Sequence, residues 1–172
     1  MLKKSTTQTD NASRRQFFRQ GLGLALLAST PFASVKAYKE PMFPVHKTPE
    51  EWRKQLSPAQ YAVLREEDTE APNTSPLLHE KRAGIFHCAG CDQALYDAAT
   101  KFESGTGWPS FYQALDQAVG TKEDKGWFMT RTEVHCANCG GHLGHIFDDG
   151  PKPTGKRHCI NGVALSFKPK TA

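Results

Sequence analysis

The spacing of apolar and polar residues predicts two short helices near the start of a folded domain. TPEE at 48–51 and SPAQ at 57–60 each place a hydroxyl at the N-cap, a proline at the first helical position and a Glu or Gln three residues after the cap. Apolar residues at helical spacing follow, and these would face a core. They are Trp52 and Leu56 in the first helix, and Tyr61 and Leu64 in the second.

Beyond these helices the pattern becomes strand-like. Residues 66–84 are rich in turn-forming residues, which predicts a surface loop. GIFHC at 84–88, GWFMTRTEV at 126–134 and CINGVALSF at 159–167 then combine alternation with β-branched and aromatic residues, and glycine-containing turns lie between them. We therefore expect a mainly β (α+β) fold, in which a small antiparallel β-domain follows two helices.

The length and the distribution of charge limit what the chain does. Its 172 residues suffice for one modest domain rather than two. The net charge of +4 would favour nucleic acid as a partner, but residues 1–37 hold six basic residues and one acidic residue. This leaves a net charge of −1 for residues 38–172, so this part of the chain has no excess positive charge with which to bind a phosphate backbone. No nucleic-acid partner is expected.

The first 37 residues have the three parts of an export signal. SRRQFFR at 13–19 resembles the twin-arginine (Tat) motif, a weakly hydrophobic stretch follows, and Val35-Lys36-Ala37 ends in a suitable cleavage site. We expect a twin-arginine signal peptide over 1–37, an extended arm over 38–47 and a folded domain over 48–168. The mature protein would be periplasmic after cleavage near Ala37, with no remaining membrane anchor. An amphipathic N-terminal helix is the alternative interpretation.

Four of the five cysteines form two Cys-x-x-Cys pairs. Cys88 and Cys91 make the first pair, and Cys136 and Cys139 make the second. Two intervening residues let one tight turn aim both sulfurs at the same point, and four thiolates satisfy the tetrahedral preference of zinc. The spacing predicts one structural Zn²⁺ with no open coordination position. Disulfides between the two pairs are the alternative in an oxidising compartment, and a thioredoxin-like redox motif would need a βαβ setting that the pattern lacks.

The fifth cysteine, Cys159, has no partner in this arrangement. A leftover thiol in an exported protein is an intermolecular bridge, a reactive group or a buried inert residue. Arg157 and His158 precede it directly, and cationic neighbours favour the nucleophilic thiolate. Alternation along a strand would put Cys159 on the same face as Arg157 and Asn161. These neighbours favour the reactive interpretation.

Three segments together resemble a known family. GWPSF at 107–111, EVHCANCGGHLGHIFDDGP at 133–151 and RHCINGVALSF at 157–167 are similar to the methionine-R-sulfoxide reductases of the MsrB family, in the order of that family. The resemblance extends from about Thr48 to Phe167. It implies two antiparallel β-sheets joined by the zinc site, short N-terminal helices and a catalytic domain over 48–168. It also implies an enzyme, a peptide-methionine (R)-S-oxide reductase, that repairs oxidised proteins carrying methionine-R-sulfoxide.

The resemblance implies a role for five residues. Cys159 matches the nucleophile that attacks the sulfoxide sulfur and becomes a sulfenic acid, and His145 matches the proton donor, with His142 beside it. Asn161 matches a position that holds the oxygen or its water network, and Trp108 matches the wall that receives the S-methyl group. Without the resemblance, a packing role for Trp108 and a turn-fixing role for His142 and His145 would be the simpler interpretations.

The sequence departs from the family pattern at two positions. Thr106 stands where many members carry a resolving cysteine, so we expect an external thiol, either thioredoxin-like or small, to reduce the sulfenic acid. Gly162 stands where serine often follows the motif asparagine. The mature protein is expected to be a monomer. A zinc-bound β-domain without activity, acting as a redox sensor or binding module, and a chaperone-like or nucleotide-exchange scaffold are the competing functional classes.

Overall fold

The fold is given by a computed structural model, which describes residues 43–125 and 130–171. The expected signal peptide and the first half of the expected arm, residues 38–42, lie outside these residues. Within them, no helix combines the length and apolar character needed to cross a bilayer.

Both predicted helices form at the expected capping boxes. Helix α1 spans Pro49–Gln55 and helix α2 spans Pro58–Glu66. At the start of α1, Thr48 Oγ1 accepts from the Glu51 amide at 3.3 Å, and Glu51 Oε2 accepts from the Thr48 amide at 2.7 Å. The same reciprocal pair begins α2. These bonds satisfy amides that have no partner inside the helix.

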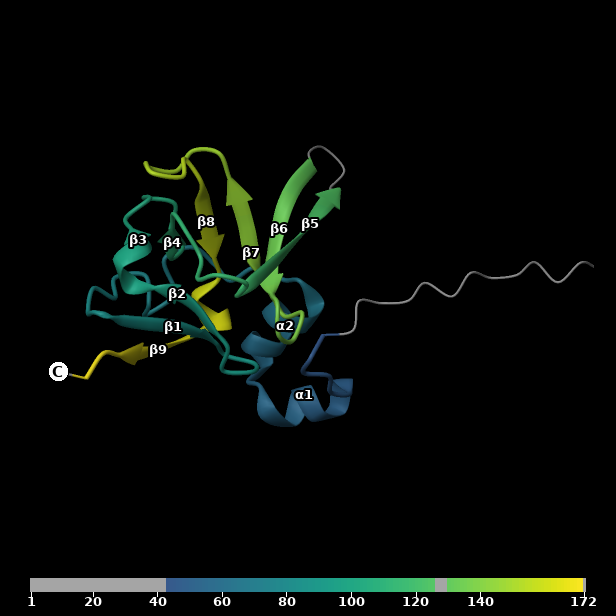
Figure 1. The fold of residues 1–172 in the computed structure, drawn as a ribbon. Coiled ribbons are helices and arrows are strands. Elements are labelled where there is room, and N and C mark those ends of the chain that lie inside the picture. Colours follow the sequence, from purple (N-terminus) through teal and green to yellow (C-terminus); the bar gives the residue numbers. More distant parts are fainter. Residues whose placement is uncertain (1–42, 126–129, 172) are drawn as a thin grey trace, which may run out of the picture. The chain divides into compact units, whose positions relative to one another are not determined.

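Nine strands form two antiparallel sheets in the described residues. The three-stranded sheet has the order β2-β1-β9, and the six-stranded sheet has the order β3-β4-β8-β7-β6-β5 (Figure 1). The strand bounds are β1 Gly84–Cys88, β2 Ala94–Asp97, β3 Lys101–Phe102, β4 Ser110–Phe111, β5 Val119–Lys125, β6 Thr130–Cys136, β7 His142–Phe147, β8 Arg157–Ile160 and β9 Leu165–Pro169. Short 3₁₀ turns lie at Ala98–Thr100 (η1) and Gly162–Ala164 (η2). The mainly β expectation with two antiparallel sheets and two short helices is confirmed.

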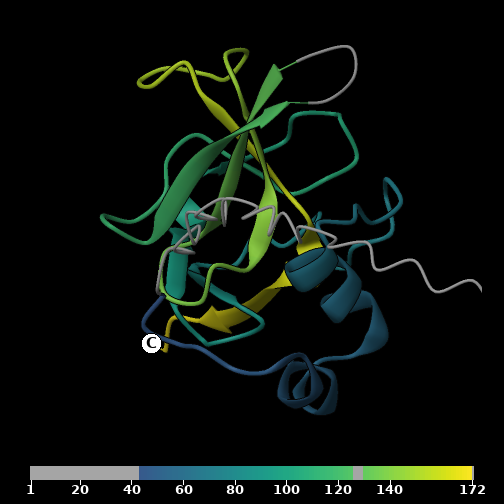
Figure 2. The same cartoon turned by 90° about the vertical axis from the view of Figure 1, so that its right-hand side faces the viewer.

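Aromatic rings from both sheets meet in the core. Phe111 of β4 stacks on Tyr96 of β2 with ring centroids 4.4 Å apart, and it contacts Phe86 of β1 edge-on at 5.0 Å. All three side chains are fully buried. Burial of such rings contributes about 1.5–3 kcal/mol each and holds the two sheets face to face. Helix α2 packs against β7 and η2, so both helices lie at one side of the sheets (Figure 2).

The segment at 159–167 differs from a single continuous strand. It divides into β8, the turn η2 and β9, and the two strands belong to different sheets. Asn161 is the N-cap of η2, where the chain leaves the six-stranded sheet for the three-stranded one. The alternation of apolar and polar residues continues on both sides of this turn, so the sequence pattern did not reveal the break between the two strands. The division places Asn161 directly at the boundary between the sheets.

Candidate functional site

The four paired cysteines come together where β1 and β6 end. Cys88 and Cys136 are the last residues of these strands, and each partner cysteine follows after a tight turn. All four sulfurs lie within 4.8 Å of one another. Cys88 Sγ is 3.7 Å from Cys139 Sγ, and Cys91 Sγ is 3.5 Å from Cys136 Sγ. All five cysteines of the chain have free thiols.

These separations fit a metal ion bound by four thiolates. A Zn–S bond of about 2.3 Å places the sulfurs of a tetrahedron about 3.8 Å apart, close to the observed values. A disulfide would require sulfurs about 2.05 Å apart. The four cysteines therefore form a possible metal site that joins the three-stranded sheet, through β1, to the six-stranded sheet, through β6.

Polar contacts fix the two cysteine turns from outside. Gln55 of α1 donates through Nε2 to the Gly90 carbonyl in the first turn. Arg65 of α2 donates through Nη1 to the Cys139 carbonyl in the second turn at 3.0 Å. The side-chain amide of Asn138 points at Cys91 Sγ with a separation of 3.5 Å. Each helix thus holds one of the turns, and contacts of this kind orient metal ligands.

Cys159 lies on β8, at a cavity of about 150 Å³. It pairs directly with His145 on β7 and with Ser110 on β4, so these three side chains share one face of the sheet. The cavity walls include Trp108, Arg131, His145, Phe147, Cys159 and Asn161. Four of the five residues assigned from the resemblance are therefore brought together, and His142 does not line the cavity.

Close backbone packing and burial shape the surroundings of Cys159. A Cβ built on Gly144 would lie 2.0 Å from the Cys159 carbonyl oxygen, so only glycine allows β7 this close to β8. Thr106 Oγ1 lies 4.0 Å from Cys159 Sγ. Burial raises the pKa of the Cys159 thiol, while the Arg157 charge and the Thr106 hydroxyl oppose that rise. The thiol is therefore protonated at neutral pH before a substrate binds.

The two basic neighbours of Cys159 behave differently from the sequence expectation. The imidazole of His158 lies against Tyr96 on the other side of β8, with Nδ1 3.2 Å from the tyrosine hydroxyl. Burial and the nearby Lys156 lower its pKa to about 4, so it is neutral. Arg157 remains on the Cys159 side, where two hydrogen bonds of 2.8 and 2.9 Å join it to Asp149. Of these two neighbours, Arg157 alone therefore favours the thiolate.

His145 is held by a carboxylate on the opposite side from Cys159. Its Nε2 lies 2.9 Å from Asp124 Oδ2, and Arg131 donates to the same oxygen at 3.1 and 2.7 Å. Burial lowers the pKa of His145, and the hydrogen bond to Asp124 opposes this shift. Asp124 and Arg131 were missed in the sequence, because they meet only through the register of β5 and β6.

His142 lies behind His145, with ring centroids 5.4 Å apart. Its Nδ1 is 2.9 Å from Glu133 Oε1, and both side chains are only 3% exposed. Lys122 lies 2.8 Å from the other oxygen of Glu133 and compensates the buried charge. Burial lowers the pKa of His142 as well. This arrangement lets His142 support the His145 ring without contacting a ligand in the cavity.

Trp108 and Asn161 are both tied to the main chain of Glu70. Trp108 Nε1 donates to the Glu70 carbonyl at 3.0 Å, and Asn161 Oδ1 accepts from the Glu70 amide at 3.0 Å. The side-chain amide of Asn161 also donates to the Leu143 carbonyl at 3.0 Å. Glu70 lies in the loop at 66–84, and its sequence carries no motif that would single it out.

Comparison with known proteins agrees with this geometry. Residues 56–169 match the model of the SelR domain. The chain is 55% identical over 125 residues to the peptide methionine sulfoxide reductase MsrB of Methanosarcina barkeri, covering 72% of this chain and 88% of that protein. It is 54% identical over 127 residues to the MsrB of Pseudomonas putida, covering 73% and 96% of the two chains. The chain belongs to the MsrB family.

Membership of the MsrB family confirms the family assignment made from the three sequence segments. The matched range contains the four paired cysteines and the five residues assigned a role from the resemblance, four of which line the cavity. A solved structure, that of the Mis18 "Yippee-like" domain, aligns with 53% of this chain and 100% of its own at 14% identity and a TM-score of 0.44, too distant a likeness to bear on fold or function.

Proposed function

We propose that this MsrB protein reduces the R epimer of methionine sulfoxide in oxidised proteins, with Cys159 as the nucleophile. One observation carries the proposal. The single thiol outside the four-cysteine cluster faces His145 across two paired strands, at a cavity that Trp108 and Phe147 line with aromatic rings. A thiol, an acid and an apolar wall are the groups that this reduction needs.

The chemical step transfers two electrons from Cys159 to the sulfoxide. The Cys159 thiolate attacks the sulfoxide sulfur, and His145 supplies a proton to the sulfoxide oxygen. The S–O bond breaks as the oxygen passes to Cys159, which yields methionine and a Cys159 sulfenic acid. Asp124 orients the imidazole, and His142 packs behind it. Trp108 packs against the S-methyl group, and Asn161 holds that side of the cavity.

An external thiol completes the cycle. It condenses with the sulfenic acid, releasing water and forming a mixed disulfide, and a second thiol then releases Cys159. The chain has five cysteines, and four of them form the cluster. The residue beside Cys159 at 4.0 Å is Thr106, which cannot form a disulfide. A thioredoxin-like protein or a small thiol therefore supplies the electrons.

The cluster of Cys88, Cys91, Cys136 and Cys139 holds one structural Zn²⁺. Thiolates are soft ligands that select zinc among abundant divalent ions, and four of them leave no open position for catalysis. The metal supplies cohesion between two sheets, and the reaction proceeds on the residues around Cys159.

The activity is tested with the purified chain, dabsyl-methionine-R-sulfoxide and dithiothreitol. We expect turnover of the R epimer, no turnover of the S epimer, and none by Cys159→Ser. Equal inactivity of both proteins would favour a binding module instead. Size-exclusion chromatography of the same preparation is expected to give a monomer.

We also propose export of the folded protein to the periplasm through the twin-arginine route, with cleavage near Ala37 and no anchor afterwards. The basic doublet Arg14-Arg15 before an apolar stretch supports this proposal. Arg14→Lys/Arg15→Lys in the full chain should retain the protein in the cytoplasm, while Lys3→Gln/Lys4→Gln should be exported normally. Export of the arginine variant would contradict the route.

A further inference from the structure

We infer that Glu70 is a positioning residue for the reduction, which holds Trp108 and Asn161 in place through its main chain. The inference rests on the proposed function. Glu70 follows the end of α2 by four residues and lies between two cavities. Its neighbour Thr69 lines both the cavity at Cys159 and a separate groove of about 560 Å³, whereas Glu70 lines the groove and not the cavity.

The main chain of Glu70 serves two residues of the site. Its carbonyl accepts the indole N–H of Trp108, and its amide donates to the side-chain oxygen of Asn161, both at 3.0 Å. The first bond fixes the angle of the indole plane. The second orients the Asn161 amide, whose nitrogen already donates to the Leu143 carbonyl. A displacement of this one peptide segment would therefore move both walls of the cavity together.

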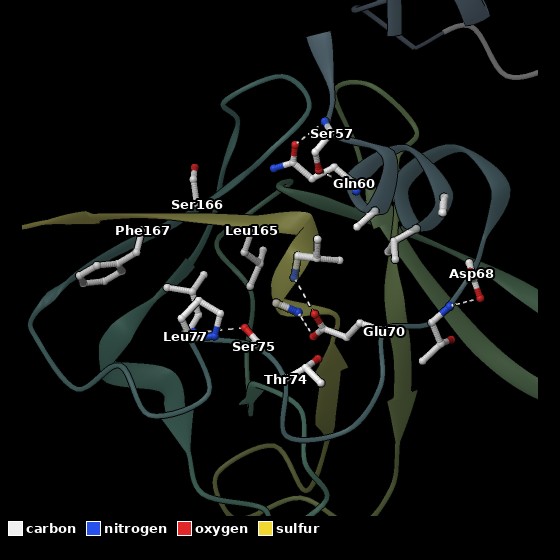
Figure 3. Close-up of a pocket in the computed structure, with 17 residues that line it drawn as sticks. Ser57, Gln60, Asp68, Glu70, Thr74, Ser75, Leu77, Leu165, Ser166 and Phe167 are labelled. Carbon is white, nitrogen blue, oxygen red and sulfur yellow. Dashed lines mark hydrogen bonds between the residues drawn. The ribbon is translucent and has the colours of Figure 1, made fainter. Parts of the chain in front are cut away.

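The carboxylate of Glu70 anchors that segment. It accepts hydrogen bonds from the Gly162 amide and, at 3.0 Å, from the Val163 amide. Figure 3 shows these two bonds on the groove side, where the Glu70 side chain reaches the start of η2. Asn161 is the N-cap residue of η2, but its side chain makes no capping bond to an amide of this turn. The Glu70 carboxylate satisfies these amides instead, as a charged acceptor.

The direction of the side chain separates positioning from catalysis. The Glu70 carboxylate faces the groove and bonds to main-chain amides, so it touches neither Cys159 nor a ligand in the cavity. Its influence passes through the backbone to Trp108 and Asn161. Misplacement of site groups by about 1 Å can cost about 100-fold in rate, so loss of this anchor should be visible in the kinetics.

The test compares Glu70→Ala, Glu70→Gln and the exposed control Glu66→Ala in the full-length chain. We expect Glu70→Ala to lower kcat/KM for the R-sulfoxide by about 10- to 100-fold. The kcat/KM of Glu70→Gln should fall between that of Glu70→Ala and that of the wild type, because Gln keeps one acceptor oxygen and replaces the other by an amide nitrogen, which cannot accept from a main-chain amide. The NMR resonance of the Trp108 indole N–H, assigned through Trp108→Phe, should shift in Glu70→Ala and stay unmoved in Glu66→Ala.

Wild-type kcat/KM and an unmoved indole resonance in Glu70→Ala would overturn the inference. If Glu70→Ala does not fold, kcat/KM and the indole resonance are measured on Glu70→Gln instead. Wild-type values of both in Glu70→Gln would overturn the inference. A wild-type protein without R-sulfoxide activity would refute the proposed function instead. In that case the indole resonance still tests whether Glu70 holds Trp108.

Discussion

The hydroxyl oxygen of Ser75 lies 1.8 Å from the position that a Cβ on Gly162 would occupy. The Ser75 Cβ is only 2.5 Å from the same point, and Ser75 is buried. Gly162 is not among the residues with positive φ, so the backbone itself would accept a side chain there. Ser75 thus occupies the space next to Asn161 that a side chain at position 162 would need.

This contact predicts strong coupling between the two positions. Gly162→Ser alone should destabilise the fold by about 1–3 kcal/mol through overpacking. Ser75→Gly should relieve the clash, so Ser75→Gly/Gly162→Ser should be more stable than the sum of the single variants implies. Urea unfolding of the four proteins measures the coupling. If the change in free energy of unfolding of the double variant equals the sum of the changes in the two single variants, Ser75 does not cause the clash and the predicted coupling is wrong.

The position of Thr106 predicts that a single substitution can introduce an internal disulfide into the catalytic cycle. Because its hydroxyl is 4.0 Å from Cys159 Sγ, Thr106→Cys should place a thiol where it can condense with the sulfenic acid. One turnover without reductant should then consume both thiols, as counted by thiol titration. The wild type and the control Thr106→Ser should instead form a sulfenic acid that dimedone traps. Full dimedone labelling of Thr106→Cys would contradict this.

The half-buried pair of Cys159 and His145 allows a prediction of the pH profile of kcat/KM. The reactive form needs a thiolate and an imidazolium, yet burial raises the pKa of Cys159 and lowers the pKa of His145. Below the His145 pKa, the imidazole is fully protonated and the rate rises with pH as thiolate forms. Above the Cys159 pKa, the thiolate is complete and the rate falls as imidazolium is lost. Between the two pKa values, the thiolate fraction rises with pH as the imidazolium fraction falls, so the rate stays constant.

We therefore expect a broad plateau that starts below about pH 6.5 and ends above about pH 8.5. The acid limb reports His145, which Asp124, Arg131 and His142 surround, and the alkaline limb reports Cys159. His145→Asn should be slower by about 100-fold or more, and its rate should rise continuously up to the Cys159 pKa. A bell-shaped profile that persists in His145→Asn would assign the acid limb to another group.

The four-cysteine cluster predicts how metal loss affects the protein. Cys91→Ser should contain less than one zinc per chain by elemental analysis and should melt at a lower temperature than the wild type, because binding free energy contributes to folding. Asn138→Ala should weaken metal affinity by about 10-fold, since its amide points at Cys91 Sγ. Cys159→Ser is the matched control, with full zinc and an unchanged melting temperature. Full zinc in Cys91→Ser would exclude a four-thiolate site.

Local patterns in the sequence were sufficient for the helices and the cysteine cluster. A capping box and a Cys-x-x-Cys turn each depend on residues only three positions apart, so their structures follow from short-range chemistry. The order of the segments along the chain also supplied Trp108, His145, Cys159 and Asn161 through family resemblance. The structure places these four residues at one cavity.

Features that depend on register and tertiary packing were beyond the sequence. Asp124 meets Arg131 only because β5 and β6 pair in one register, and Glu70 reaches Asn161 across 91 residues of chain. Proximity in sequence also misled, because His158 adjoins Cys159 but points to the opposite side of β8. Burial then reversed the expected direction for the Cys159 pKa.

The turn at η2 has a mechanical consequence. Covalent continuity joins the two sheets there, the sulfur cluster joins them a second time, and the Ala89 amide bonds to the Ala164 carbonyl at 2.9 Å between these junctions. Loss of an ion from the four thiolates would remove one of the links between the sheets, on the side of the molecule where the peptide junction carries Asn161, while the aromatic contacts of Phe111 with Tyr96 and Phe86 would remain. We therefore expect oxidation of these remote thiolates to loosen the surroundings of Cys159 without any oxidant entering its cavity.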